Sequence, residues 1–263
     1  MKIKLISMRI AIIVILFATL TSAMIMDSRN DYVKVDTKLY ASPYEVTNKE
    51  YREFLTALKS TGKDEVYSKC LYDSTQWVQK FPGSFNQPMQ DAYHSHPAYN
   101  NYPIVNITRE AAALYCIWVT EKYNSAAKKK YKKVQFRLPT VTEWKKIAAP
   151  LPGHTLPWYG NLPYLSGAEN IALANIKVLD YSKGGNNYAF DGGFHTTVVG
   201  HYKPNSYGLY DIIGNVSEMT QSDVLLGGSW DNYLDECAID NSQIYELPDP
   251  RVGFRMVMEV IEE

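Results

Sequence analysis

The chain has 263 residues, of which 46% are hydrophobic and 21% are charged, which is enough apolar sequence for one large core or two small ones. Its formal net charge of −1 gives no electrostatic basis for binding nucleic acid or an anionic membrane surface, so we expect no nucleic-acid partner. Tyrosine is abundant, with 21 residues. Because a tyrosine ring packs while its hydroxyl stays hydrogen-bonded, we expect most of them to be structural.

The N-terminus has the features of a signal peptide over residues 1–23. Lys2, Lys4 and Arg9 precede an apolar stretch, and small residues suited to cleavage end it at Ala23. The stretch is shorter than the ~20 residues that span a bilayer comfortably, but an uncleaved leader would hold the protein at a membrane, and that alternative stays open. No cysteine follows the stretch, so lipid attachment there is not expected. The sequence predicts export to the periplasm, the outer membrane or the cell surface.

Three helices can be expected from their N-terminal caps. Thr47 with Glu50 and Thr140 with Glu143 have the spacing of capping boxes, and Thr108 is suited to cap a helix between them. Apolar residues recur at helical spacing after each cap. They are Tyr51, Phe54, Leu55 and Leu58, then Ala111, Leu114, Tyr115 and Trp118, then Trp144, Ile147 and Ala148.

The rest of the chain predicts short strands joined by long loops. Residues 196–200 and 224–226 have strand-like composition, and residues 128–133 form a basic run that we interpret as a solvated loop. Loops of such length inside a compact domain are usually functional, or fixed by ions and side-chain hydrogen bonds. No repeat or composition break marks a second domain. We therefore expect one α+β domain over residues 30–263.

Three cysteines follow the leader, Cys70, Cys116 and Cys237. An odd number in an exported chain leaves at least one thiol unpaired, and the sequence does not fix any pairing. Cys116 falls on the apolar face of a predicted helix, which favours a buried, inert thiol. His94 and His96 lie in a segment rich in tyrosine and proline, where we expect surface positions rather than metal ligands.

Glycine punctuates three segments near the C-terminus, over residues 204–218, 227–230 and 253–255. Such segments need backbone geometry that a Cβ would obstruct. Asp211, Asn215 and Glu218 lie close enough in sequence for one loop to present several oxygens inward, as a hard cation requires.

Together with residues 44–48, 103–118 and 137–144, these segments make six motifs in an order that resembles the sulfatase-modifying-factor family, whose founding members are formylglycine-generating enzymes. The resemblance covers nearly all of the chain after the leader. It implies a C-type-lectin-like α+β fold that is poor in regular secondary structure and has long ordered loops.

The resemblance also implies two structural calcium sites. Carboxylates and backbone carbonyls are the oxygen ligands that Ca²⁺ takes. The first site maps onto Asn175, Ile176, Asp191 and a carbonyl near Phe194, and the second onto Asp211, Gly214, Val216 and Glu218. The alternative for the second site is that its two acidic residues only cap turns.

The catalytic positions match in part. Formylglycine-generating enzymes bind copper with two cysteines five positions apart after the Gly-Gly-Ser motif, and here Cys237 takes the first position while Ser242 stands at the second. A hydroxyl is a poor ligand for Cu(I), so copper is not expected and Cys237 is left as the single candidate catalytic residue. Cys70 or Cys116 could still complete a pair in space. The acidic residues that we expect to raise the pKa of the Cys237 thiol are Asp235, Glu236 and Asp240.

A narrower resemblance involves residues 73–99, which look like the insert of gliding-motility and type IX secretion lipoproteins. It implies a non-catalytic scaffold or binding protein whose partners are other envelope or secretion-system proteins, although this chain lacks their lipid-attachment cysteine. Two alternatives stay open, a formylglycine-generating oxidase acting on sulfatases and a lectin-like ligand-binding module. The residues that could form a lectin-like face are Trp230, Asp231, Tyr233, Asp235 and Tyr245.

Overall fold

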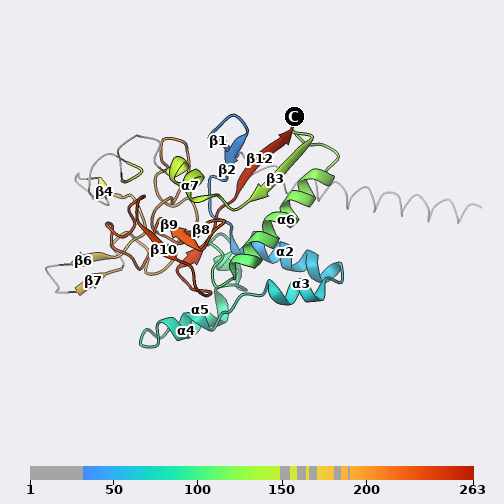
Figure 1. Ribbon diagram of the computed structural model, residues 1–263. Helices are drawn as coiled ribbons and strands as arrows, with labels where there is room; N and C mark the ends of the chain where they lie inside the picture. Colours follow the sequence, from blue (N-terminus) through green and yellow to red (C-terminus); the bar gives the residue numbers. More distant parts are fainter. Residues whose placement is uncertain (1–31, 149–154, 159–163, 166–170, 181–184, 189) are drawn as a thin grey trace, which may run out of the picture. The chain divides into compact units, whose positions relative to one another are not determined.

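The computed structural model describes residues 32–148, 155–158, 164–165, 171–180, 185–188 and 190–263. The expected signal peptide, residues 1–23, lies outside these ranges. Residues 33–263 form one compact unit (Figure 1). None of the described helices combines the length and the apolar content that crossing a membrane requires.

The unit is an α+β fold with little regular secondary structure, as the sequence predicts. Its described helices are α2 (Asn48–Ser60), α3 (Asp64–Lys69), α4 (Gln76–Lys80), α5 (Gln87–Ala92), the 3-10 turn η1 (Pro97–Tyr99), α6 (Arg109–Ser125) and α7 (Val141–Ala148). Its described strands are β1 (Val33–Lys34), β2 (Leu39–Ala41), β3 (Lys133–Arg137), β4 (Tyr164–Leu165), β5 (Ile171–Ala172), β6 (Val178–Asp180), β7 (Gly185–Asn187), β8 (Ser217–Met219), β9 (Val224–Leu226), β10 (Ser242–Ile244), β11 (Val252–Gly253) and β12 (Val257–Glu262).

The three expected helices begin at their predicted caps. The hydroxyl of Thr47 accepts from the amide of Glu50, whose carboxylate accepts in return from the amide of Thr47, which completes the capping box of α2. Thr108 caps α6 by accepting from the amide of Ala111 at 3.0 Å. Side chains within a turn of each other supply these bonds, which is why the sequence locates the helices well.

Three short helices and one strand depart from expectation. The prediction does not include α3, α4 and α5, which are too short to show a clear helical period. Residues 196–200 were expected as a strand and that prediction is wrong, because no ladder forms there. The amide of Thr197 donates instead to the side chain of Asn215, at 2.8 Å, and the hydroxyl of Thr196 donates to Tyr93. Side-chain hydrogen bonds of this kind compete with ladder formation.

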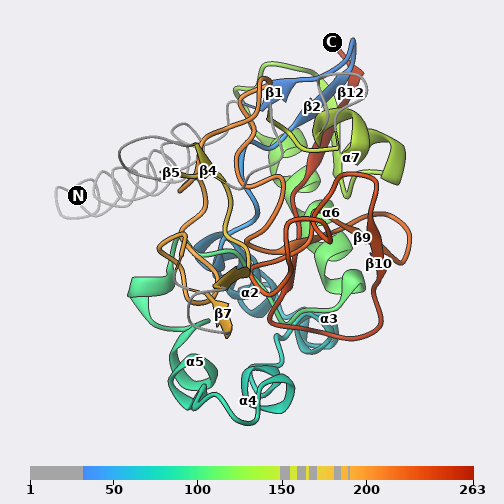
Figure 2. The ribbon, with the colours of Figure 1, turned by 90° about the vertical axis from the view of Figure 1, so that its left-hand side faces the viewer.

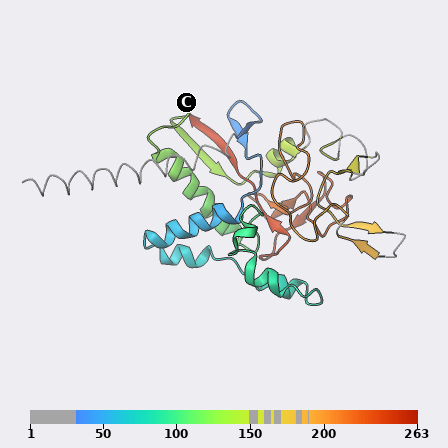
Figure 3. The ribbon, with the colours of Figure 1, turned by 180° about the vertical axis from the view of Figure 1, so that it is seen from behind.

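The first sheet brings the two ends of the domain together. Its order is β1-β2-β12-β3, so the last strand, β12, pairs antiparallel with β2 on one side and β3 on the other. Helix α6 lies along β3, with α2 next to it (Figures 1 and 3). The outer edge of β3 is satisfied by α6, because Thr120 bonds the backbone of Phe136 and Asn124 bonds the backbone of Val134. This edge is therefore closed to further strands.

The second sheet is built from the C-terminal motifs and has the order β10-β9-β8-β11. Its strand β9 confirms the prediction for residues 224–226. Strand β11 pairs parallel with β8, and β10 is the outer strand at the opposite edge (Figure 2). The main core cluster draws on both sheets, with Val257 of β12 and Leu226 of β9, and it includes Trp144 and Ile212, with Cys237 buried among them.

Candidate functional site

A fully buried ion pair holds the C-terminal motifs together. The guanidinium of Arg255 donates to the carboxylate of Glu218 through Nε, at 2.7 and 2.8 Å, and both side chains have no exposed surface. The indole nitrogen of Trp144 donates to the same carboxylate at 2.7 Å. These bonds join β8, α7 and the segment before β12. The carboxylate of Glu218 thus stabilises the packing of three distant segments.

The remaining donors of Arg255 bond backbone carbonyls on the opposite side. They reach Ser42 and Pro43, each at 3.2 Å, and Tyr210 at 2.8 Å. Arg255 consequently fixes the loop that leads to residue 211 against the segment after β2. Because every donor is used inside the protein, Arg255 is structural.

Two more carboxylic acids lie beside this pair. Asn215 donates to Glu45 at 2.9 Å and accepts from Asn175 and from the amide of Thr197. Burial raises the pKa of Glu45 well above its ordinary value, and the neighbouring carboxylate of Asp211 raises it further. Burial and Asp211 therefore favour the neutral form of Glu45, against the opposing effect of Arg255.

Asp211 is the second of these acids and was expected as a calcium ligand. Its Oδ2 accepts from the amide of Gly200 at 2.5 Å, while its buried Oδ1 has no partner in the described part of the chain. Burial raises the pKa of Asp211 to about 6, against the opposing effects of that amide and of Arg255. A buried oxygen without a donor is a place where a water or a cation would be stabilised.

The second predicted calcium set is only partly assembled. Of its two acidic side chains, Glu218 is already bonded to Arg255 and Trp144, so a calcium ion would have to share that carboxylate with a guanidinium. Gly214 donates to the carbonyl of Gly227 and lies against residue 175, where a side chain would overlap the backbone. The set therefore fits a calcium ion poorly as the side chains stand.

The first predicted calcium set fits better. The two oxygens of Asp191 accept from the amides of Ile176, at 2.7 Å, and Gly193, at 2.9 Å. Burial raises the pKa of Asp191 to about 6. Asn175 lies next to it and donates to the carbonyl of His195 at 2.8 Å. The carboxylate of Asp191 is buried and no ion pair neutralises it within the described residues, so a cation there would be stabilised if it replaced the backbone amides as the partner of these oxygens.

Cys237 is buried in the main core and has no exposed surface. Its sulfur lies so close to Gly228 that a Cβ at residue 228 would overlap it. Burial raises the pKa of the thiol to about 12, and Glu236 and Asp235 contribute, as the sequence predicts, although burial is the larger cause. Asp240 acts elsewhere, in an exposed ion pair with Lys145. A thiol in this state is neither accessible nor ionised.

The other catalytic position lies in a different environment. Ser242 is exposed on β10, opposite Leu226. Cys70 and Cys116 are also buried and unpaired, and burial raises the pKa of both thiols. Within the described ranges no three His, Cys, Asp or Glu side chains come close enough together to hold a metal ion.

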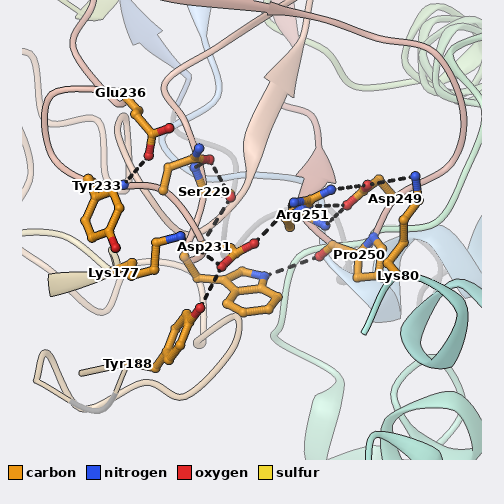
Figure 4. A network of polar contacts seen from close by, with 12 residues as sticks. Lys80, Lys177, Tyr188, Ser229, Asp231, Tyr233, Glu236, Asp249, Pro250 and Arg251 are labelled. Carbon is orange, nitrogen blue, oxygen red and sulfur yellow. Dashed lines mark hydrogen bonds and ion pairs between the residues drawn. The ribbon is translucent and has the colours of Figure 1, made fainter. Parts of the chain in front are cut away.

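A second polar network lies nearer the surface, around Asp231 (Figure 4). Its carboxylate accepts from the hydroxyl of Tyr188 at 3.0 Å and from Arg251 at 3.2 Å, and lies 3.4 Å from the ammonium of Lys177. Arg251 also bonds both oxygens of Asp249, which lowers the pKa of that carboxyl. The network joins the β6–β7 region to the C-terminal loops.

The insert over residues 73–99 is tied to this network. Lys80, at the end of α4, lies 3.5 Å from the carboxylate of Asp249. Trp77 stacks near Trp230, and Phe81 packs against Trp230 with ring centroids 5.2 Å apart. The insert is therefore an integral part of the domain.

The five residues of the alternative lectin-like face differ in exposure. Trp230 is 4% exposed, Asp231 is engaged in ion pairs, Tyr233 and Tyr245 are partly buried, and Asp235 is exposed. His94 was expected at the surface but is buried, stacked on Tyr72 at 4.0 Å. Ring packing buries both Trp230, which contacts Trp77 and Phe81, and His94, which contacts Tyr72 and the adjacent Tyr93.

Comparison with known proteins identifies the family. The family model for the "Sulfatase-modifying factor enzyme 1-like domain" matches residues 22–260. The bovine (Bos taurus) "Inactive C-alpha-formylglycine-generating enzyme 2" is 27% identical over 232 residues, which is 76% of this chain and 68% of that protein. The mouse (Mus musculus) "Formylglycine-generating enzyme" is 27% identical over 202 residues, or 69% of this chain. The chain spans about half of the mouse enzyme, with 48% covered.

Solved structures agree on the fold. PvdO from Pseudomonas aeruginosa superposes with a TM-score of 0.53 at 17% identity, covering 84% of this chain and 80% of that one. Treponema denticola variable protein 1 gives a TM-score of 0.52 at 19% identity, covering 84% of each chain. With the family model matching almost the whole described unit, this chain belongs to the sulfatase-modifying factor enzyme 1-like domain family and has its α+β fold.

Proposed function

We propose that this chain is an exported, non-catalytic binding or scaffold protein of the cell envelope. The observation that carries the proposal is the state of Cys237, which is buried, protonated and packed against Gly228. Oxidation of a substrate cysteine would need an ionised thiol that copper and peptide can reach. The relatives include a formylglycine-generating enzyme and an inactive one at the same 27% identity. Overall similarity therefore does not distinguish the two functions, and the proposal rests on the environment of Cys237.

The direct test is an activity assay. Purified protein is incubated with Cu(I), oxygen and a cysteine peptide derived from a sulfatase, and the products are examined by mass spectrometry for an aldehyde. We expect none, with an active formylglycine-generating enzyme as the positive control. Aldehyde formation that is lost in Cys237→Ser would show that the chain is an oxidase and overturn the proposal.

The partners in this proposal are other envelope or secretion-system proteins, as in gliding motility and type IX secretion. The support is the insert over residues 73–99, which packs against Trp230 and Asp249 as part of the domain. Deleting the gene in the native cell and measuring secreted protein tests this role. Unchanged secretion and motility would remove the secretion assignment.

The proposal includes a calcium ion as a structural stabiliser and no role for copper. Support for calcium comes from the buried carboxylate of Asp191 beside Asn175 and Ile176, and in lesser degree from the free oxygen of Asp211. An ion bound at either place would stiffen the loops that precede β8. Metal analysis of the purified protein measures both metals at once.

A further inference from the structure

Strand β10 is an edge strand that nothing covers in the described part of the domain. It pairs with β9 through the register Ser242↔Leu226 to Ile244↔Val224, and all three of its residues are exposed. It lies at the outside of the second sheet (Figure 2). The edge at β3 differs, because helix α6 bonds its backbone. An uncovered edge offers unpaired backbone donors and acceptors to another strand.

The register shows which backbone groups of β10 point outward. The amide of Tyr245 donates to the carbonyl of Asp223 at 2.7 Å, so residue 245 faces β9. Because hydrogen-bonding direction alternates along an antiparallel strand, Gln243 also faces β9. The N–H and C=O groups of Ser242 and Ile244 therefore point away from the sheet, and within the described residues β10 has no second neighbour.

Apolar side chains accompany this free edge. Ile244 is 65% exposed and Leu247 is 66% exposed, so two large apolar side chains lie at the surface three positions apart. Ile244 lies opposite Val224, which is itself only partly buried. A strand added at this edge would cover Ile244 in addition to pairing its backbone.

The charge around the edge indicates what kind of strand would be favoured. Residues 231–250 contain six acidic residues and no lysine or arginine. Exposed acids flank β10 on both sides. They are Asp223, Asp235, Glu236, Asp240 and Glu246, of which Asp223 and Asp240 are paired with Arg109 and Lys145. A second copy of the edge would bring like charges together, whereas a basic segment would be attracted.

We infer that the free edge of β10 is a docking site for an extended segment of a partner protein that alternates lysine or arginine with apolar residues. The segment pairs with the outward backbone groups of Ser242 and Ile244, covers the side chain of Ile244 and neutralises the flanking acids. This inference rests on the proposed non-catalytic binding role, for which it names the class of partner.

The test uses a labelled synthetic peptide, (Lys-Val)5, and measures its binding to the whole protein by fluorescence anisotropy at low and moderate salt. The peptide (Lys-Pro)5 has the same charge but cannot pair as a strand, and serves as the control. We expect (Lys-Val)5 to bind at least tenfold more tightly than (Lys-Pro)5. Salt should weaken this binding, since charge attraction contributes to it.

Two proline variants separate edge pairing from charge. Ile244→Pro removes an outward N–H that has no internal partner, so the fold should persist while peptide affinity falls at least tenfold. Gln243→Pro removes an inward N–H of the β9–β10 ladder and should lower the melting temperature instead. The double variant Asp240→Asn/Glu246→Gln should weaken binding several-fold, whereas Glu65→Gln, which changes an exposed acid on α3, should leave it unchanged.

The inference would be overturned by binding that survives in a folded Ile244→Pro variant, by equal binding of the two peptides, or by self-association that sedimentation shows and Ile244→Pro abolishes. The last would assign the edge to a second copy. Absence of peptide binding would remove this inference and leave the non-catalytic role standing, because that role is decided separately by the aldehyde assay.

Discussion

Replacing Arg255 with methionine should destabilise the protein strongly. Arg255→Met keeps most of the side-chain length but leaves the carboxylate of Glu218 buried, with Trp144 as its remaining donor. Breaking a buried pair on one side costs about 3–5 kcal/mol. The carbonyls of Ser42, Pro43 and Tyr210 also lose their donor, which adds on the order of 1 kcal/mol or more.

That loss is large compared with the ~5–15 kcal/mol that stabilise a typical domain. The two losses together are about 4–6 kcal/mol, and at roughly 2–4 °C for each kcal/mol in a domain of this size the melting temperature should fall by about 8–24 °C. Urea unfolding of wild type and variant measures the free energy directly, provided that the slope with denaturant is unchanged.

The matched control is Arg109→Met, which breaks an ion pair at the surface. In that pair the side chain of Arg109 is 36% exposed and that of Asp223 is 64% exposed. It should cost less than about 1 kcal/mol. Adding Glu218→Met to Arg255→Met should recover part of the loss, since no buried charge then remains. A loss below about 1 kcal/mol for Arg255→Met alone would refute the structural role of the pair.

The remaining predictions concern a thiol, a histidine, a metal and the leader. Cys237 should not react with Ellman's reagent in the folded protein and should react on unfolding, because its thiol is buried and its pKa is raised to about 12; rapid native labelling that Cys237→Ser removes would contradict this. Burial lowers the pKa of His94 from 6.5 to about 4. Between these pH values His94 is protonated in the unfolded chain and neutral in the folded one, so the free energy of unfolding should fall as pH falls from about 6.5 to about 4. Relative to His94→Gln, the loss should reach up to roughly 3 kcal/mol. If the urea midpoints of the two proteins changed with pH in parallel, the lowered pKa of His94 would be disproved. Calcium should raise the melting temperature relative to a chelator, and Asp191→Asn should reduce that rise; an identical rise in the variant would exclude the first site. Intact mass of protein from the native envelope should lack residues 1–23, whereas a mass that includes them would indicate an uncleaved anchor.

Local signals in the sequence predicted local structure well. The caps at Thr47 and Thr108 located α2 and α6, since a cap is decided by residues three positions apart. The motif order predicted the family and the fold. The short helices α4 and α5 were missed because packing of Trp77, and not a helical period, holds them in place.

The candidate site depended on partners that are distant in sequence. The sequence offered Glu218 as a calcium ligand, yet Arg255, 37 positions later, takes its oxygens. From the sequence alone Asp231 could have been an exposed acid. Its partners Lys177 and Arg251 lie in other segments of the chain, so the sequence did not show that it is ion-paired. The signal that could have indicated this was the run of six acids without a basic residue over 231–250, followed at once by Arg251.

The state of Cys237 is the central claim, and copper binding tests it most directly. Purified protein is mixed with one equivalent of Cu(I) held by a colorimetric chelator, and the copper transferred to the protein is measured for wild type and Cys237→Ser. A thiol that is buried beside Gly228 and has its pKa raised to about 12 predicts no transfer that depends on Cys237. Transfer of one equivalent to the wild type, and none to Cys237→Ser, would contradict it.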